Sequence, residues 1–157
     1  MQQQPTLTGV VVVVAVLALA SVLGWWRRRR DGRFRPVAAP VDSLGPPSGG
    51  ASGSAALAAL GVPAGTVTLV QFSAPVCAPC RATRRVLADV QGRVDGLRLI
   101  EVDVEERLDL ARELDVWRTP TVLVVDAAGR IVQRASGVPA KGAILAAVTP
   151  LLAEARR

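Results

Sequence analysis

Residues 71–81 read QFSAPVCAPCR and contain both cysteines of the chain, Cys77 and Cys80. A run typical of a strand, residues 66–72, leads into this stretch, and a run typical of a helix, residues 82–91, leads out of it. Two intervening residues allow the sulfurs to close a small disulfide ring. The start of a helix offers free N–H groups and a positive dipole end to the first sulfur, and this stabilises its reactive thiolate. The pattern predicts a redox-active pair at a strand-to-helix junction.

Two other interpretations of the cysteines stay open from the residues alone. Free cysteines are often inert residues of a hydrophobic core. A cysteine pair can also form half of a zinc site, which typically has four Cys or His ligands. The chain has no histidine and no third cysteine, so such a site would need carboxylates or a second chain. We therefore expect neither a metal nor any other cofactor.

The positive charge of the chain is concentrated in one short segment. The formal net charge is +6 and the isoelectric point is about 11.1, which would fit a nucleic-acid-binding protein. However, residues 27–35 contain six arginines and one aspartate, and these account for +5 of the total. The remainder of the chain is nearly neutral, so we expect no nucleic-acid partner.

Residues 7–26 are predicted to form a membrane-spanning helix. The run has twenty residues without a charge and is rich in Val, Leu and Ala, about the length that crosses the hydrocarbon core. Trp25 and Trp26 lie at its end, where aromatic rings favour the membrane interface. The alternatives are a buried helix of a soluble protein and a cleaved signal peptide. A signal peptide fits poorly because the basic residues follow the apolar run instead of preceding it.

The arginines also predict an orientation, because basic flanks tend to stay on the cytoplasmic side. We expect the domain after the helix in the cytoplasm, with an extracytoplasmic domain as the alternative. The arginines either contact anionic lipid headgroups or simply stop the apolar run. Residues 36–53 are rich in Pro, Gly and Ser and poor in large apolar side chains, which is typical of a linker. The expected segments are a short tail at 1–6, the membrane helix at 7–26, an Arg-rich juxtamembrane segment at 27–35, the linker at 36–53 and a folded domain at 54–157.

The folded domain is predicted to have a mixed sheet of four strands, with a fifth possible, and helices on both faces. Strands are expected where apolar residues alternate or form a short continuous run, and helices where they recur at helical spacing. The turn at residues 127–129 is short enough to make the two strands beside it an antiparallel hairpin. The predicted strands are 67–72, 97–103, 121–126 and 130–135. The predicted helices are 55–60, 82–91, 105–114 and 139 or 140 to 154, the last kinked or split at Pro150.

Residues 54–155 resemble the thioredoxin family in three features. The first is the Cys77-Ala78-Pro79-Cys80 box between a strand and a helix. The second is Thr119-Pro120-Thr121, forty residues after Cys80, which is similar to the family's cis-proline loop. The third is the spacing of Gly129 and Gly137, which matches a hairpin glycine and a partner-docking glycine. The resemblance implies a thioredoxin-like α/β domain, after one N-terminal membrane helix, with a cis peptide bond before Pro120.

The chain departs from the family pattern at four positions near the cysteines. Ala78 stands where the family usually has glycine. Val76 and Ser73 stand where it has tryptophans, and Gln71 stands where it has a buried acid. The resemblance is therefore to a thioredoxin-like protein and not to a general-purpose thioredoxin.

The resemblance implies roles for individual residues. Cys77 is the attacking thiol and Cys80 the resolving thiol of a redox-active disulfide. Trp117 is either a docking surface or, the interpretation that we favour, a cap on the sheet edge. The residues expected to bind the substrate are Val76, Thr119, Pro120 and Gly137. Those expected to support the site are Gln71 as a neutral polar group beneath it, Pro79 at the helix start, and Arg81 as a nearby charge or as a solvated helix residue.

The leading functional hypothesis is a membrane-tethered thiol–disulfide oxidoreductase that reduces protein disulfides. Its expected partners are protein disulfide or dithiol substrates, an unidentified electron donor, and membrane lipid through residues 7–35. We expect a monomer. The alternatives are a module that binds a soft metal such as Cu(I) or Zn(II), and a redox-sensing domain without turnover.

Overall fold

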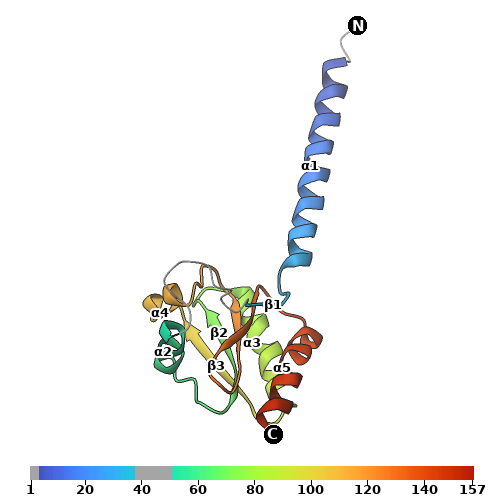
Figure 1. Cartoon of the computed structure of the whole chain (residues 1–157). Coiled ribbons are helices and arrows are strands. Elements are labelled where there is room, and N and C mark those ends of the chain that lie inside the picture. The colour runs from blue at the N-terminus through green and yellow to red at the C-terminus, as the bar shows by residue number, and fades with distance from the viewer. Residues whose placement is uncertain (1–3, 38–50) are drawn as a thin grey trace, which may run out of the picture. The chain divides into compact units, whose positions relative to one another are not determined.

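The computed structural model describes residues 4–37 and 51–157. The chain divides into two compact units, Met1–Asp31 and Gly32–Arg157. The described part of the first unit consists of helix α1, Gln4–Arg30, and Asp31 (Figure 1). Its segment Gly9–Trp26 is long and apolar enough to cross a membrane, by length and composition alone, and a signal sequence near the N-terminus would pass the same test. Residues 4–6 of the predicted tail belong to α1, and residues 1–3 lie outside the described residues.

The second unit is built on a five-stranded sheet with the order β1-β5-β4-β2-β3. Strands β2 and β3 are parallel, and the other neighbouring pairs are antiparallel. The mixed sheet confirms the predicted fold class, and the fifth strand is present (Figure 1). The strands are β1 (Arg35–Pro36), β2 (Val67–Ser73), β3 (Leu97–Asp103), β4 (Thr121–Val125) and β5 (Ile131–Ser136).

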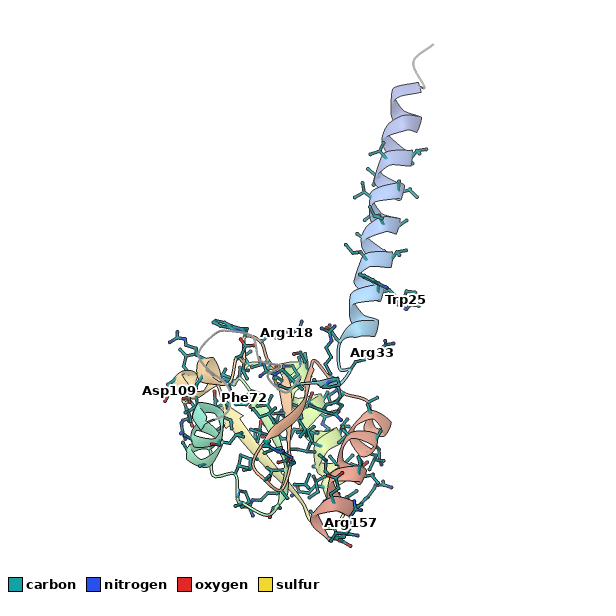
Figure 2. The ribbon with its side chains drawn as sticks, in the orientation of Figure 1. Trp25, Arg33, Phe72, Asp109, Arg118 and Arg157 are labelled. Carbon is teal, nitrogen blue, oxygen red and sulfur yellow. A yellow bond between two sulfur atoms is a disulfide. The ribbon has the colours of Figure 1, made fainter. Side chains whose placement is uncertain are left out.

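Helices cover both faces of this sheet. On one face, α2 (Ala51–Ala59) and α4 (Leu108–Glu113) pack against a core that includes Val70 and Phe72 (Figure 2). On the other face, α3 (Ala78–Gln91) and α5 (Lys141–Ala155) pack against a core that includes Val67 and Leu69. All seven residues of β2 are buried for this reason, as expected of a central strand covered on both sides.

Several helix ends differ from the prediction. Helix α2 begins at Ala51 instead of residue 55. Helix α4 begins at Leu108 instead of residue 105, because the Asp103 carboxylate accepts a hydrogen bond of 2.8 Å from the Glu105 N–H and holds a turn there. Helix α5 runs through Pro150 to Ala155, so no final turn splits off at that proline.

The largest difference concerns the segment that follows α1. The sequence placed Arg35 in a juxtamembrane segment and Pro36 at the start of a linker. In the structure both residues form β1, with Arg35 opposite Arg134 and Pro36 opposite Gln133. Residues 38–50 of the predicted linker lie outside the described residues, and residues 51–53 belong to α2. The folded unit therefore includes residues well before the predicted boundary at residue 54.

Candidate active site

The two cysteines form a disulfide at the start of α3, and their Cα atoms are 5.2 Å apart. Cys77 is the N-cap residue with an extended backbone (φ −138°), and its sulfur accepts a hydrogen bond of 3.1 Å from the Cys80 N–H. Pro79 lies in the first turn of the helix. The backbone N–H groups of this turn have no carbonyl partner within the helix, so the N–H that proline lacks is not needed there. The local sequence thus places the first sulfur at the N-terminal end of a helix, where the Cys80 N–H donates to it, and this position favours a thiolate in the reduced protein.

The two sulfur-bearing residues differ in exposure. Cys77 is 9% exposed and Cys80 is 1% exposed. Val76, the residue before Cys77, is 98% exposed, and Ala78 and Pro79 are exposed as well. A partner can therefore approach Cys77 from solvent, whereas Cys80 lies beneath its neighbours.

Gln71 lies on β2 beneath the second cysteine. By strand alternation its side chain is on the same sheet face as Val67 and Leu69, which α3 and α5 cover, and the residue is 1% exposed. The side-chain Nε2 donates a hydrogen bond of 3.1 Å to the Cys80 carbonyl oxygen. In the described part of the chain, the Gln71 Oε1 atom has no hydrogen-bond partner. The residue is a buried neutral amide at this position, and it cannot accept a proton from a thiol.

A polar network next to Gln71 was not predicted. The pairing of β2 with β3 places Glu101 directly opposite Gln71. Ser73 donates a hydrogen bond of 2.8 Å to the Glu101 carboxylate, and Arg84 of α3 forms an ion pair with the same oxygen. Partial burial raises the pKa of Glu101, but the hydrogen bonds from Arg84 and Ser73 outweigh it, so the pKa lies below its ordinary value.

The sequence offered only a weak signal for this network. Ser73 lies two residues after Gln71 and Arg84 lies one turn after Cys80, which places both near the cysteines. The side chain of Arg84 is 54% exposed, on the solvent side of α3. The pairing with Glu101 depends on the register between β2 and β3, which the residues of α3 do not reveal.

The loop before β4 lies beside the cysteine-bearing turn. The Thr119–Pro120 peptide bond is cis, as the resemblance implied. Thr121 pairs with Phe72 near the end of β2, so the loop approaches the segment that leads into Cys77. The Gly137 N–H donates a hydrogen bond of 2.8 Å to the Pro120 carbonyl oxygen. Three of the predicted substrate-binding residues, Thr119, Pro120 and Gly137, are thereby brought together at this end of the sheet.

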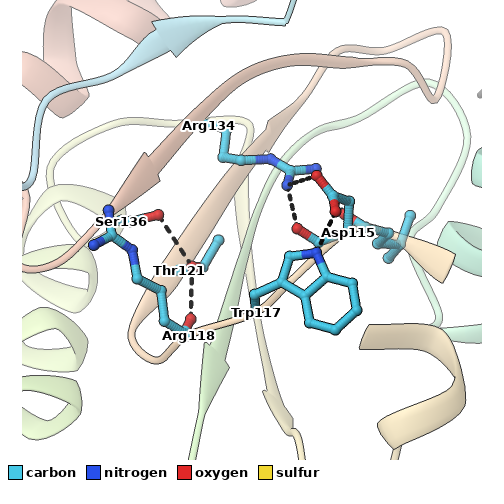
Figure 3. A network of polar contacts seen from close by, with 7 residues as sticks. Asp115, Trp117, Arg118, Thr121, Arg134 and Ser136 are labelled. Carbon is cyan, nitrogen blue, oxygen red and sulfur yellow. Dashed lines mark hydrogen bonds and ion pairs between the residues drawn. The ribbon is translucent and has the colours of Figure 1, made fainter. Parts of the chain in front are cut away.

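Trp117 extends from the same loop into solvent. The residue is 76% exposed, so the favoured prediction that it caps the sheet edge is wrong. Its indole Nε1 donates a hydrogen bond to the Asp115 carboxylate (Figure 3). Asp115 has a positive φ of 55° and closes α4: its N–H bonds to the Arg112 carbonyl, and the Val116 N–H bonds to the Ala111 carbonyl. The end of a helix therefore positions the tryptophan.

Arg134 of β5 holds this helix end from the other side. Its guanidinium donates hydrogen bonds to the carbonyl oxygens of Asp115 and Leu114, at 2.5 Å and 2.6 Å (Figure 3). Cationic donors at the last carbonyls of a helix stabilise that end. The loop between α4 and Pro120 is thus braced by a residue from a different part of the chain.

Arg81 lies exposed on α3, one residue after Cys80. Among residues 4–37 and 51–157, no group of three or more His, Cys, Asp or Glu side chains could hold a metal ion.

Comparison with known proteins agrees with this geometry. The thioredoxin family profile matches residues 61–150. Thioredoxin of Bacillus subtilis is 33% identical over 79 residues, which cover 50% of this chain and 75% of that protein. An H-type thioredoxin of Oryza sativa is 34% identical over 62 residues, covering 40% of this chain and 51% of that protein. The chain spans only 38% to 51% of the length of the plant thioredoxins that it matches.

A solved structure of a thioredoxin mutant from Halobacterium salinarum is also similar. It is 25% identical, with a TM-score of 0.51, over 54% of this chain and 74% of that one. The fold is the thioredoxin-like α/β fold, and the cysteine pair lies at the start of a helix that follows its central strand. The chain belongs to the thioredoxin family.

Proposed function

We propose that this protein is a membrane-tethered enzyme that reduces protein disulfides with Cys77 and Cys80. The observation that carries the proposal is the asymmetry of the pair. Cys77 caps the helix and is the more exposed residue, at 9%, whereas Cys80 is 1% exposed within the first turn. Such an arrangement supplies one sulfur for attack and a second within reach to complete the reaction.

The reaction proceeds in two displacements. The Cys77 thiolate attacks one sulfur of the substrate disulfide, forms a mixed disulfide and expels the other substrate sulfur as a thiolate. The Cys80 thiolate then attacks the Cys77 sulfur, closes the Cys77–Cys80 disulfide and releases the remaining substrate sulfur. The substrate gains two electrons and two protons, and the enzyme's dithiol loses them. A dithiol donor must reduce the enzyme again before the next turnover.

The proton on Cys80 needs an acceptor before the second displacement. Gln71 touches the Cys80 carbonyl but, as an amide, cannot take that proton. The thiolate released from the substrate in the first displacement is a suitable base, and solvent water is the other. Pro79 and Arg81 support the site less directly, through the helix start and through a nearby positive charge.

The substrate segment would lie along the residues around the exposed sulfur. Val76 offers an apolar surface that is 98% exposed. The loop at Thr119 and Pro120 lies at the adjacent strand end, with Gly137 hydrogen-bonded to Pro120. These backbone and apolar groups suit an extended peptide around a disulfide.

The proposed tether is the apolar segment of α1. The arginines at 27–30 follow this segment directly, which favours a cytoplasmic position for the domain. In that compartment thiols are kept reduced, so the pair would work as a reductase, as a monomer on protein substrates.

Reduction of insulin by dithiothreitol, followed by turbidity, tests the activity. The full-length protein in detergent is expected to accelerate precipitation, and Cys77→Ser to return the rate to that of dithiothreitol alone. An unchanged rate with the native protein would reject the enzyme and favour a redox-sensing domain. A reporter fused to the C-terminus tests the side of the membrane, and a signal from the extracytoplasmic side would reject the proposed location.

A further inference from the structure

We propose that this protein acts on disulfides of other membrane proteins that lie close to the bilayer surface. The reason is that the connection between its catalytic domain and α1 is very short. The inference rests on the proposed function, and it adds the substrate class. Four observations on the segment after α1 carry it.

Gly32 is seated against the loop that follows β5. Its N–H donates a hydrogen bond of 2.5 Å to the Ser136 carbonyl oxygen, and its φ is +78°. A Cβ atom at this position would lie 2.1 Å from the Val138 carbonyl oxygen. Only glycine fits both the backbone conformation and the close approach. The contact between residue 32 and the loop after β5 therefore requires a glycine at this position; we call this contact the Gly32 seat.

The residues after Gly32 continue the attachment. Arg35 and Pro36 pair with β5, and the Val37 N–H donates a hydrogen bond of 3.1 Å to the Val132 carbonyl oxygen. Phe34 packs against the core between the sheet and helices α3 and α5. Backbone pairing, an apolar anchor and a glycine seat thus hold residues 32–37 to the domain.

This attachment adjoins the loop proposed to bind substrate. Gly32 bonds to the carbonyl of Ser136, and the next residue, Gly137, bonds to the carbonyl of Pro120. The Ser136 carbonyl and the Gly137 N–H belong to the same peptide unit. This unit therefore links Gly32 to the cis-proline loop through one hydrogen bond on each side. The chain enters the domain at the end of the sheet where the cysteine pair lies.

The connection between α1 and the domain is a single residue. Helix α1 ends at Arg30 and Gly32 is already seated, so only Asp31 lies between them. Two chain steps span at most about 7 Å, whatever the angle between the two units. The Pro- and Gly-rich residues 38–50 connect β1 to α2, and both of these elements belong to the same unit. Residues 38–50 of the predicted linker therefore do not lie between α1 and the domain.

A short tether confines the cysteine pair to a thin layer beside the membrane. A membrane anchor raises the effective concentration of a substrate only when the substrate disulfide lies at a height above the membrane that the tethered cysteine pair can reach. A disulfide on a short stem in the same membrane lies within it, whereas a free protein gains nothing from the anchor. Membrane proteins with cysteines a few residues from the bilayer are thus the substrate class that the attachment favours.

The test uses the full-length protein in lipid vesicles and a fluorescent peptide that contains one disulfide. The peptide is presented free, or coupled to lipid through a short or a long Gly-Ser spacer. A tether variant carries twenty Gly-Ser residues between Asp31 and Gly32, which extends its reach by roughly 25 Å. A matched control carries the same insertion between Gly49 and Gly50, inside the connection from β1 to α2.

We expect the native protein and the matched control to reduce the short-spacer peptide about tenfold faster than the long-spacer peptide. The tether variant should lose most of this preference while reducing the free peptide at the native rate. Equal native rates on both spacers, or loss of the preference in the matched control, would overturn the inference. Absence of reduction even of the free peptide would instead reject the proposed function.

Amide hydrogen exchange gives a readout that does not depend on activity. The N–H groups of Gly32 and Val37 should exchange slowly in the full-length protein, because both are hydrogen-bonded to the domain. Exchange at the rate of an unfolded chain would show that the segment is a loose tether, and the inference would fall.

Discussion

The side-chain amide of Gln71 donates a hydrogen bond to the backbone carbonyl of Cys80, and the two atoms are 3.1 Å apart. This bond joins the central strand to the first turn of α3 directly beneath the disulfide. Because Gln71 is only 1% exposed, a carboxylate at position 71 would be desolvated and its pKa would rise. Such an acid exchanges protons with a thiol near neutral pH, and an amide does not.

Gln71→Glu should therefore speed the second displacement, by at least about tenfold if the new acid works as a general base. Stopped-flow measurement of mixed-disulfide resolution tests this expectation. Gln71→Met is the matched control, since it fills a similar volume and cannot accept a proton. Equal resolution rates for Gln and Glu would mean that Gln71 only packs, and that the proton of Cys80 leaves through solvent.

The same substitution should make stability depend on pH. A buried acid with a raised folded pKa contributes its stability below the unfolded pKa, about 4.3 for Glu. That contribution is lost as pH rises toward the folded pKa. Denaturation curves at pH 6 and pH 9 should show that the unfolding free energy falls more between the two pH values for Gln71→Glu than for the native protein. A parallel response of both proteins would contradict a buried position for the new acid.

The two cysteines should behave differently when replaced singly. Cys77→Ser is expected to abolish disulfide reduction, and Cys80→Ser to accumulate mixed disulfides with its substrates, because only the resolving step is lost. In the reduced protein, alkylation at graded pH should modify Cys77 first, with an apparent pKa below about 8.5. Preferential labelling of Cys80 would reverse the two assigned roles.

Glu101→Gln should remove a pH-dependent contribution to stability. Partial burial raises the pKa of Glu101, but Arg84 and Ser73 lower it by more. A lowered folded pKa contributes stability above the unfolded value of about 4.3, and this is lost as pH falls through the folded pKa. Denaturation at pH 7 should therefore give a larger unfolding free energy for the native protein than for Glu101→Gln. This difference should shrink at pH 3. An advantage of equal size at both values would mean that the charge of Glu101 is not involved.

Gly32→Ala should unseat the segment after α1. The added Cβ would meet the Val138 carbonyl oxygen at 2.1 Å, and the φ of +78° is unfavourable for alanine. We expect a loss of about 1–3 kcal/mol in unfolding free energy and faster amide exchange at Val37. Gly142→Ala is the matched control: its Cβ meets nothing within 4 Å on α5, and it should be neutral or stabilising. Equal effects of the two substitutions would show that Gly32 has no special seat.

Trp117→Ala should affect partner binding more than folding. The residue is 76% exposed, so the change in stability should stay within about 0.5 kcal/mol. KM for a protein disulfide should rise while kcat is retained, because the indole lies beside the cis-proline loop. Leu108→Ala, which removes another exposed apolar side chain, is the control. An unchanged KM would leave Trp117 without a role in docking.

Local sequence was sufficient for the elements that carry the chemistry. The buried run before the cysteines predicted β2, and alternation of apolar residues predicted β3 with the same bounds as in the structure, Leu97–Asp103. The Cys-x-x-Cys spacing with a helical pattern behind it placed the disulfide at a helix start. These features depend on side-chain periodicity and backbone capping, which act between residues a few positions apart.

Other features exist only because distant residues meet. Arg35 and Pro36 carry no strand pattern, and they form β1 because β5, almost a hundred residues later, offers unpaired backbone groups to them. Glu101 reaches Ser73 and Arg84 through strand register and helix packing, and Trp117 is exposed because Asp115 and Arg134 hold its loop. Register and loop position are settled by which hydrogen bonds and apolar contacts can form together in the folded chain, and no local pattern encodes that choice.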